Sequence, residues 1–102
     1  MPAVEDKTLL SELVIRSALE SLEGWDYDVE EKSLRRVWSF KKFVPTTGFV
    51  RKITEVMDAN NHHSDLVLDS RTRTLTVTVT THSENAVTQA DLDFAAAVND
   101  AE

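Results

Sequence analysis

Hydrophobic residues recur at helical spacing in two stretches of the first sixty residues. The first stretch predicts a helix over about 12–23, with Ser11 as its N-cap and Gly24 as the residue that stops it. The second predicts a helix over about 46–59. Gly48 falls in the first turn of that second helix, where a missing side chain would let another backbone approach closely.

Four shorter stretches alternate hydrophobic and polar residues, which is typical of β-strands. They cover about 25–30, 34–41, 66–68 and 74–80. Short polar turns separate the members of each pair, so each pair predicts an antiparallel hairpin. The last stretch alternates leucine and valine with threonine. We expect this strand to lie at an edge of the sheet, where its uncharged threonine side could pair with another subunit.

A third helix is predicted near the C-terminus. Thr88 to Asp91 fits a capping box, and apolar positions continue at helical spacing to about residue 99. The resulting order α-β-β-α-β-β-α predicts an α+β fold, a four-stranded antiparallel sheet with helices packed on one face. No linker interrupts the pattern, so residues 1–102 are expected to form a single domain in which 1–9 are a loose tail.

The composition argues against several classes of function. A net charge of −7 disfavours a nucleic-acid partner, because phosphate contacts need clustered basic side chains. No apolar run approaches the roughly 18 residues of a membrane span. The N-terminus lacks the pattern of a secretory signal and the chain has no cysteine, so we expect a cytoplasmic protein. With two glycines, the chain has no phosphate-binding loop and no dinucleotide fingerprint.

The three histidines of the chain are expected to meet. His62 and His63 lie in a polar loop after the second helix, and His82 ends the fourth strand. If the third and fourth strands form a hairpin, the start of one lies opposite the end of the other. Histidine both gives and takes protons near neutral pH, since its unperturbed pKa is about 6.5. The pattern therefore predicts a proton-transfer pocket.

Carboxyl and amide groups accompany these histidines. Asp58, Asn61 and Asp65 come to the same end of the predicted sheet, and Asp91 lies one turn into the third helix, which begins near that end. Three interpretations are open at this point: ordinary loop residues, a zinc site of three imidazoles with a carboxylate, or metal-free general acid–base catalysis. No HExxH or similar ligand spacing is present, which weakens the metal interpretation.

The same residues resemble the motif of the pterin-4a-carbinolamine dehydratase family. That motif has an acidic residue, three intervening residues, a His-His pair, a small residue, and then a strand-end histidine with an aspartate nine positions beyond it. The resemblance runs almost end to end, and it includes the Gly24-Trp25 pair after the first helix. The matching motif positions are Asp58, His62-His63-Ser64, His82 and Asp91.

The resemblance implies an α+β fold in homodimers or homotetramers, and a reaction. That reaction is dehydration of 4a-hydroxytetrahydropterin to quinonoid dihydropterin, which restores the cofactor of aromatic amino-acid hydroxylases. The pterin is the substrate, so no metal and no organic cofactor is implied. On this interpretation His62 and His82 are the acid and base, and His63 binds or orients the pterin. Five further residues are expected to bind the substrate or orient the histidines: Asp58, Asn61, Ser64, Asp65 and Asp91.

The chain departs from the family near the His-His pair. An aromatic residue usually follows two or three positions after the small residue, and here Leu66 and Val67 stand there. An aromatic ring would offer a flat pterin a stacking surface. The alternative to catalysis is a non-catalytic dimerisation or assembly factor, or a pterin-binding module, on the same fold. The presence of all three histidines favours an enzyme, and the missing aromatic residues favour a non-catalytic protein.

Overall fold

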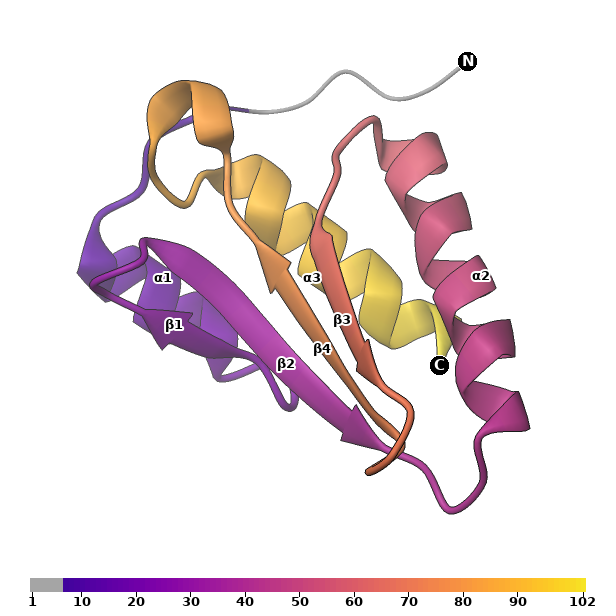
Figure 1. Ribbon diagram of the computed structural model, residues 1–102. Coiled ribbons are helices and arrows are strands. Elements are labelled where there is room, and N and C mark those ends of the chain that lie inside the picture. The colour runs from indigo at the N-terminus through magenta and orange to yellow at the C-terminus, as the bar shows by residue number, and fades with distance from the viewer. Residues whose placement is uncertain (1–6) are drawn as a thin grey trace.

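The computed structural model describes residues 7–102, and its elements follow the predicted order (Figure 1). The predicted α+β fold class is therefore confirmed, and one turn of 3-10 helix, η1 (His82–Glu84), adds to it. The helices are α1 (Glu12–Leu19), α2 (Val44–Asn60) and α3 (Gln89–Ala101). The strands are β1 (Asp26–Asp28), β2 (Ser33–Ser39), β3 (Asp65–Asp69) and β4 (Thr74–Val79).

The sheet is antiparallel throughout, in the order β1-β2-β4-β3. The expectation that the threonine-rich strand lies at an edge is wrong, because β4 pairs with β2 on one side and with β3 on the other. The chain leaves α2 and lays down β3 at the outside before β4 returns beside β2 (Figure 1). Within the described residues, the edges are β1 and β3.

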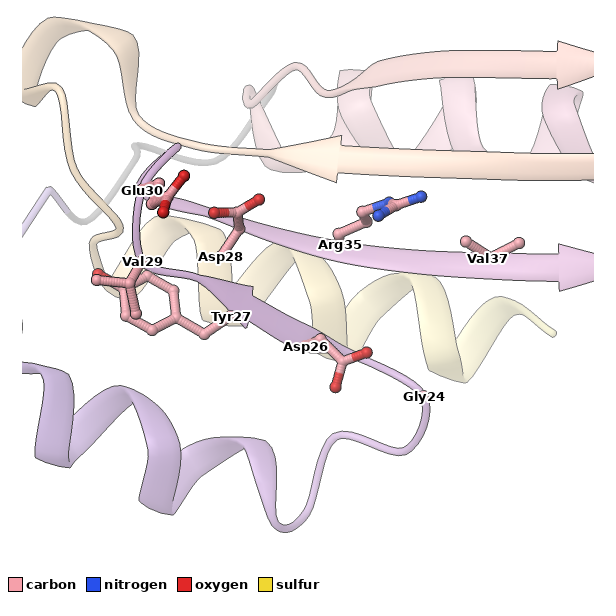
Figure 2. Close-up of a pocket in the computed structure, with 8 residues that line it drawn as sticks. All are labelled: Gly24, Asp26, Tyr27, Asp28, Val29, Glu30, Arg35 and Val37. Carbon is pink, nitrogen blue, oxygen red and sulfur yellow. The ribbon is translucent and has the colours of Figure 1, made fainter.

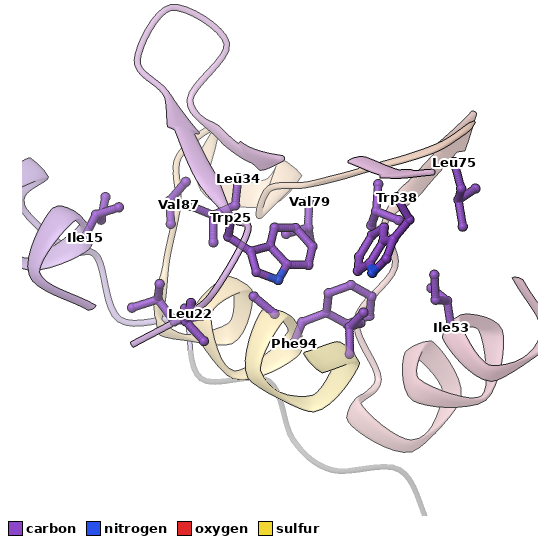
Figure 3. Close-up of a cluster of buried hydrophobic side chains, with 14 of the residues drawn as sticks. Ile15, Leu22, Trp25, Leu34, Trp38, Ile53, Leu75, Val79, Val87 and Phe94 are labelled. Atoms are coloured by element: carbon purple, nitrogen blue, oxygen red, sulfur yellow. The ribbon is translucent and has the colours of Figure 1, made fainter. Parts of the chain in front are cut away.

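One hydrophobic core joins the sheet to all three helices. From β4 it takes Leu75, Val77 and Val79, which are almost completely buried, while the alternate threonines lie half-buried on the other face. Figure 3 shows Trp25, Trp38 and Phe94 near the centre of this cluster. The Trp25 and Trp38 rings meet edge to face with centroids 6.0 Å apart, a favourable aromatic geometry. Since one sheet face supplies this core, the helices pack on that face, as predicted.

The C-terminal end of α3 is fastened to the sheet by polar groups. The indole N–H of Trp25 donates to Asn99 Oδ1 at 2.9 Å, and the indole N–H of Trp38 donates to Glu102 Oε1 at 2.7 Å. Arg36 also donates to Glu102, at 2.7 Å from Nη2 to Oε1. Tryptophan N–H groups need such acceptors when their rings are buried. These bonds fix where α3 lies on the sheet, and α3 carries Asp91.

Two expectations about glycines need correction. The helix α1 ends at Leu19, before the expected residue 23, and a series of tight turns follows it. Gly24 therefore lies in the turn into β1, at a φ of +85°, where an added Cβ would be 2.4 Å from Arg36 Nε. Around Gly48 an added Cβ would meet nothing within 4 Å, so the close backbone approach expected there is wrong.

The described part of the N-terminal tail is attached to α3. The backbone N–H of Gln89 donates to the carbonyl of Thr8 at 3.1 Å, and Leu9 pairs with Thr88 in an isolated bridge. These contacts join Thr8 and Leu9 to the start of α3, and residues 1–6 of the expected tail lie outside the described part. None of the helices within residues 7–102 is both long enough and apolar enough to cross a membrane.

Candidate active site

The end of α2 aims His62 into the protein. Asn61 takes a left-handed conformation, φ 51°, and its N–H donates to the carbonyl of Asp58 at 3.3 Å. The N–H of His62 donates to the carbonyl of Met57 at 3.1 Å. These two bonds close a Schellman motif, which ends a helix and reverses the chain. The reversal leaves His62 only 5% exposed.

The start of α3 provides a carboxylate at the same place. Thr88 and Asp91 form the predicted capping box, and the backbone N–H of Thr88 donates to Asp91 Oδ2 at 2.8 Å. Asp91 is completely buried. A buried carboxylate needs hydrogen-bond donors around it, because its desolvation is otherwise costly.

Asp91 binds two further groups, one through each of its oxygens. His62 Nε2 lies 2.6 Å from Asp91 Oδ1, and the Thr81 hydroxyl donates to Oδ2 at 2.9 Å. The hydroxyl oxygens of Thr81 and Thr88 are 2.7 Å apart. We call these four residues, His62, Thr81, Thr88 and Asp91, the Asp91 network. The His62 and Phe94 rings also meet in an edge-to-face contact, with centroids 6.1 Å apart, so His62 has both a polar and an apolar partner.

All three histidines line one cavity of about 190 Å³, which we call the histidine cavity. His62 is its buried member, whereas His63 and His82 are exposed. The β3–β4 hairpin produces this meeting, because Asp65 at the start of β3 pairs with Thr78 near the end of β4. The full lining is Lys7, His62, His63, Thr80, Thr81, His82 and Ser83.

This arrangement suits proton transfer. One imidazole is fixed by a buried carboxylate, and the two others line the same cavity. Imidazoles positioned in this way can give and accept protons near neutral pH. Among residues 7–102, no three histidine or acidic side chains are grouped closely enough to hold a metal ion.

The chain matches the sequence pattern of the pterin 4 alpha carbinolamine dehydratase family over residues 8–101. It belongs to this family. It is 36% identical to a protein of Sulfolobus acidocaldarius over 88% of this chain and 94% of that one. It is also 36% identical to a protein of Mycobacterium avium, over 89% of this chain and 93% of that one. Both are provisionally named pterin-4-alpha-carbinolamine dehydratase.

A solved structure has the same fold. The crystal structure of a "transcriptional coactivator/pterin dehydratase" from Brucella melitensis superimposes with a TM-score of 0.83 at 29% sequence identity. The alignment covers 92% of this chain and 98% of that chain.

Several residues expected at the family's site lie outside the histidine cavity. Asp58 is exposed on α2, and Asn61 serves to end that helix. The Ser64 hydroxyl is buried without a hydrogen-bond partner among the described residues. Asp65 lines a separate hollow of about 460 Å³ on the outer face of the sheet, which it shares with His82. Asp91, in contrast, is hydrogen-bonded to His62.

Leu66 also lies away from the histidine cavity. It is half-buried, pairs with Val77 in the sheet, and packs against the hydrophobic core. Its neighbour Val67 faces the opposite side of the sheet and is 64% exposed. An aromatic side chain at position 66 would therefore pack against the hydrophobic core and would not line the histidine cavity.

Sequence reasoning missed the threonine hydroxyls and Lys7. Thr81 had one signal in its favour, since it directly precedes His82, and Thr88 was expected only as a helix cap. Lys7 lines the cavity because the N-terminal segment lies along the start of α3, a contact that local sequence patterns do not reveal.

A larger hollow, about 640 Å³, lies over the outer face of β1 and β2 (Figure 2). Three acidic side chains, Asp26, Asp28 and Glu30, line it together with Arg35. It contains no histidine and no side chain of the Asp91 network. We therefore place the candidate active site of this family member at the smaller histidine cavity, where groups suited to proton transfer are gathered.

Proposed function

We propose that this protein dehydrates 4a-hydroxytetrahydropterin to quinonoid dihydropterin by metal-free general acid–base catalysis. One observation carries the proposal: three histidines line a single cavity, and one of them is bonded to a buried aspartate. Membership of the pterin 4 alpha carbinolamine dehydratase family supports the choice of substrate.

The reaction needs two proton transfers. The hydroxyl on C4a must gain a proton so that it can leave as water with the electron pair of the C–O bond. The N5 position must lose its proton as the C4a=N5 double bond forms. A well-placed acid and a well-placed base each accelerate such steps by about 10²–10⁴-fold.

We assign the acid and base to His62 and His82, with His63 binding or orienting the pterin. Both His62 and His82 line the cavity, His62 from the segment just after α2 and His82 from η1. The expectation that His82 ends the fourth strand is wrong, because β4 stops at Val79 and His82 begins the 3-10 turn that follows. The bond to Asp91 holds the His62 ring in one orientation. That fixed geometry favours proton transfer, because the reacting groups need little further ordering.

The test measures dehydration of enzymatically generated 4a-hydroxytetrahydropterin with and without the protein. His62→Ala and His82→Ala are each expected to lower kcat/KM at least about 100-fold, because each removes one proton-transfer group. Thr76→Val, on the outer sheet face, is the matched control and is expected to leave the rate unchanged. Unchanged turnover in both histidine variants would contradict the assignment.

We also propose where the reaction takes place and what it serves. The product is the precursor of a reduced pterin cofactor, so a cytoplasmic partnership with an aromatic amino-acid hydroxylase would use it. Faster sustained turnover of such a hydroxylase when this protein is added would support the partnership. The same rate with and without it would count against the partnership while leaving the dehydration itself intact.

A second candidate is a non-catalytic assembly factor on the same fold. The Brucella melitensis protein is described both as a transcriptional coactivator and as a pterin dehydratase. If this candidate is right, a variant with all three histidines replaced keeps its protein partners and its cellular effect. If the dehydratase is right, the same variant loses both activity and effect.

A further inference from the structure

We propose that Thr81 is a positioning residue for the dehydration: its hydroxyl holds the Asp91 carboxylate so that His62 presents one fixed ring orientation to the histidine cavity. The inference rests on the proposed function and deepens it. It starts from the four hydrogen-bonded side chains of the Asp91 network.

Thr81 is itself held rigidly. It is 2% exposed, its N–H donates to the carbonyl of Ala86 at 3.1 Å, and it forms an isolated bridge with that residue. Its hydroxyl lies 2.9 Å from Asp91 Oδ2 and 2.7 Å from the Thr88 hydroxyl. Because the backbone is fixed and the side chain is buried, the hydroxyl has little freedom to choose other partners.

The hydrogen bonds of the network run in one direction. A threonine hydroxyl has a single hydrogen to donate. Thr81 gives that hydrogen to Asp91, so the Thr88 hydroxyl is the donor between the two threonines. Asp91 Oδ2 then accepts from two sources, the Thr81 hydroxyl and the Thr88 backbone N–H. Oδ1 is left to face His62.

Two donors on Oδ2 fix the plane of the carboxylate and, through it, the imidazole. An ionised carboxylate only accepts hydrogen bonds, so the nitrogen of His62 that faces it must carry the proton. A carboxylate in this position sets both the tautomer and the orientation of a histidine ring. The Thr88 N–H alone would leave the carboxylate freer to rotate.

Thr81 also connects the two proposed proton-transfer groups. It is adjacent to His82 in the chain, and its hydroxyl is one hydrogen bond away from the partner of His62. The hydroxyl therefore fixes the segment between β4 and η1 to the start of α3. The separation between His62 and His82 across the cavity depends on this connection, which a simple helix-capping role would not require.

The experiment compares Thr81→Val, which keeps the shape but removes the hydroxyl, with Thr81→Ser, which keeps the hydroxyl. Thr76→Val, a threonine-to-valine change on the outer face of β4, is the control. We expect Thr81→Val to lower kcat by about tenfold with KM changed by less than about twofold, because lost positioning acts on the reacting geometry. Thr81→Ser is expected to stay within about threefold of the unmodified protein.

A second measurement is independent of turnover. Nitrogen-15 NMR of the imidazoles reports which ring nitrogen of His62 is protonated. We expect Nε2 to be fully protonated in the unmodified protein and in Thr81→Ser, and only partly protonated in Thr81→Val. If Thr81→Val does not fold, Thr81→Ala takes its place in both measurements under the same criteria.

The outcomes separate the two proposals. An unmodified protein without dehydratase activity overturns the proposed function, and the NMR comparison then decides the positioning role alone. A Thr81→Val protein with unchanged kcat and unchanged His62 signals overturns the positioning role, even if its melting temperature falls.

Discussion

The two carboxylate oxygens of Asp91 have different roles. Oδ2 accepts from the Thr88 N–H as part of a capping box, and Oδ1 faces His62. The sequence pattern predicted the capping box, the family resemblance implied a role beside the histidines, and both contacts of Asp91 are present in the structure. A helix cap and the proposed proton-transfer site therefore share one side chain, so we expect stability and activity to fall together when it is changed.

The first prediction is at this residue. Asp91→Ala leaves three buried donors, on His62, Thr81 and Thr88, without their acceptor. We expect the free energy of unfolding to fall by about 2–5 kcal/mol, since unsatisfied buried polar groups are costly. Urea denaturation measures this loss. Asp93→Ala, on the exposed side of α3, is the control and should change stability by no more than about 0.5 kcal/mol. Equal effects of the two substitutions would contradict the network.

At the scale of elements, the ends of two helices position the residues of the candidate site. His62 follows the end of α2, and Asp91 lies in the first turn of α3. The periodic patterns predicted both helices, with boundaries within two residues at most ends. They could not predict that α1 stops at Leu19, because the tight turns after it are stabilised by packing of Leu22 and Trp25 in the core.

The second prediction concerns the end of α2. Asn61 is left-handed, a conformation that asparagine and glycine tolerate and that most residues resist. Asn61→Ala is expected to lower the free energy of unfolding by about 1 kcal/mol, and Asn61→Gly to leave it nearly unchanged. Thermal and urea unfolding of the two variants test this. Equal loss in both would mean that the asparagine side chain, and not its backbone conformation, matters.

The third prediction contrasts the two glycines. Gly48→Ala in α2 has free space around it, so we expect a gain of up to about 1 kcal/mol from better helix propensity. Gly24→Ala requires both a left-handed alanine and movement of the Arg36 side chain, so we expect a loss of about 1–3 kcal/mol. Unfolding free energies of the pair give the test. Stabilisation by Gly24→Ala would show that its turn is not constrained as described.

At the scale of the whole molecule, the sheet leaves an edge available for association. β3 pairs with β4 on one side, and within the described residues no strand covers its other side. Val67 projects from this strand and is 64% exposed. Because β4 is paired on both sides, we propose that self-association uses the β3 edge and not the threonine side of β4.

The fourth prediction follows from that edge. We expect sedimentation velocity at micromolar concentration to show a dimer or larger species. Val67→Lys should shift it toward monomer, because lysine on an edge strand opposes strand pairing. Val37→Lys, on the same outer face but on the internal strand β2, should have less effect. A monomer in the unmodified protein, or a stronger effect of Val37→Lys, would rule out association through β3.

The sequence by itself determined the helices, the hairpins, the fold class and the family motif. These features depend on local periodicity, on caps within four residues and on turns between neighbouring strands. Residues close together in the sequence therefore determine them. The convergence of the histidines also followed, because a single hairpin brings His82 back toward His62.

Only the tertiary structure decided the strand order and the partners of the site. The order depends on which strand of the second hairpin pairs with β2, and either choice satisfies the same periodicity. Asp91 lies 29 positions from His62, and their contact depends on how α3 is fastened across the sheet by Asn99 and Glu102. The Thr81 hydroxyl reaches Asp91 because of tertiary packing, and local sequence patterns do not predict this hydrogen bond.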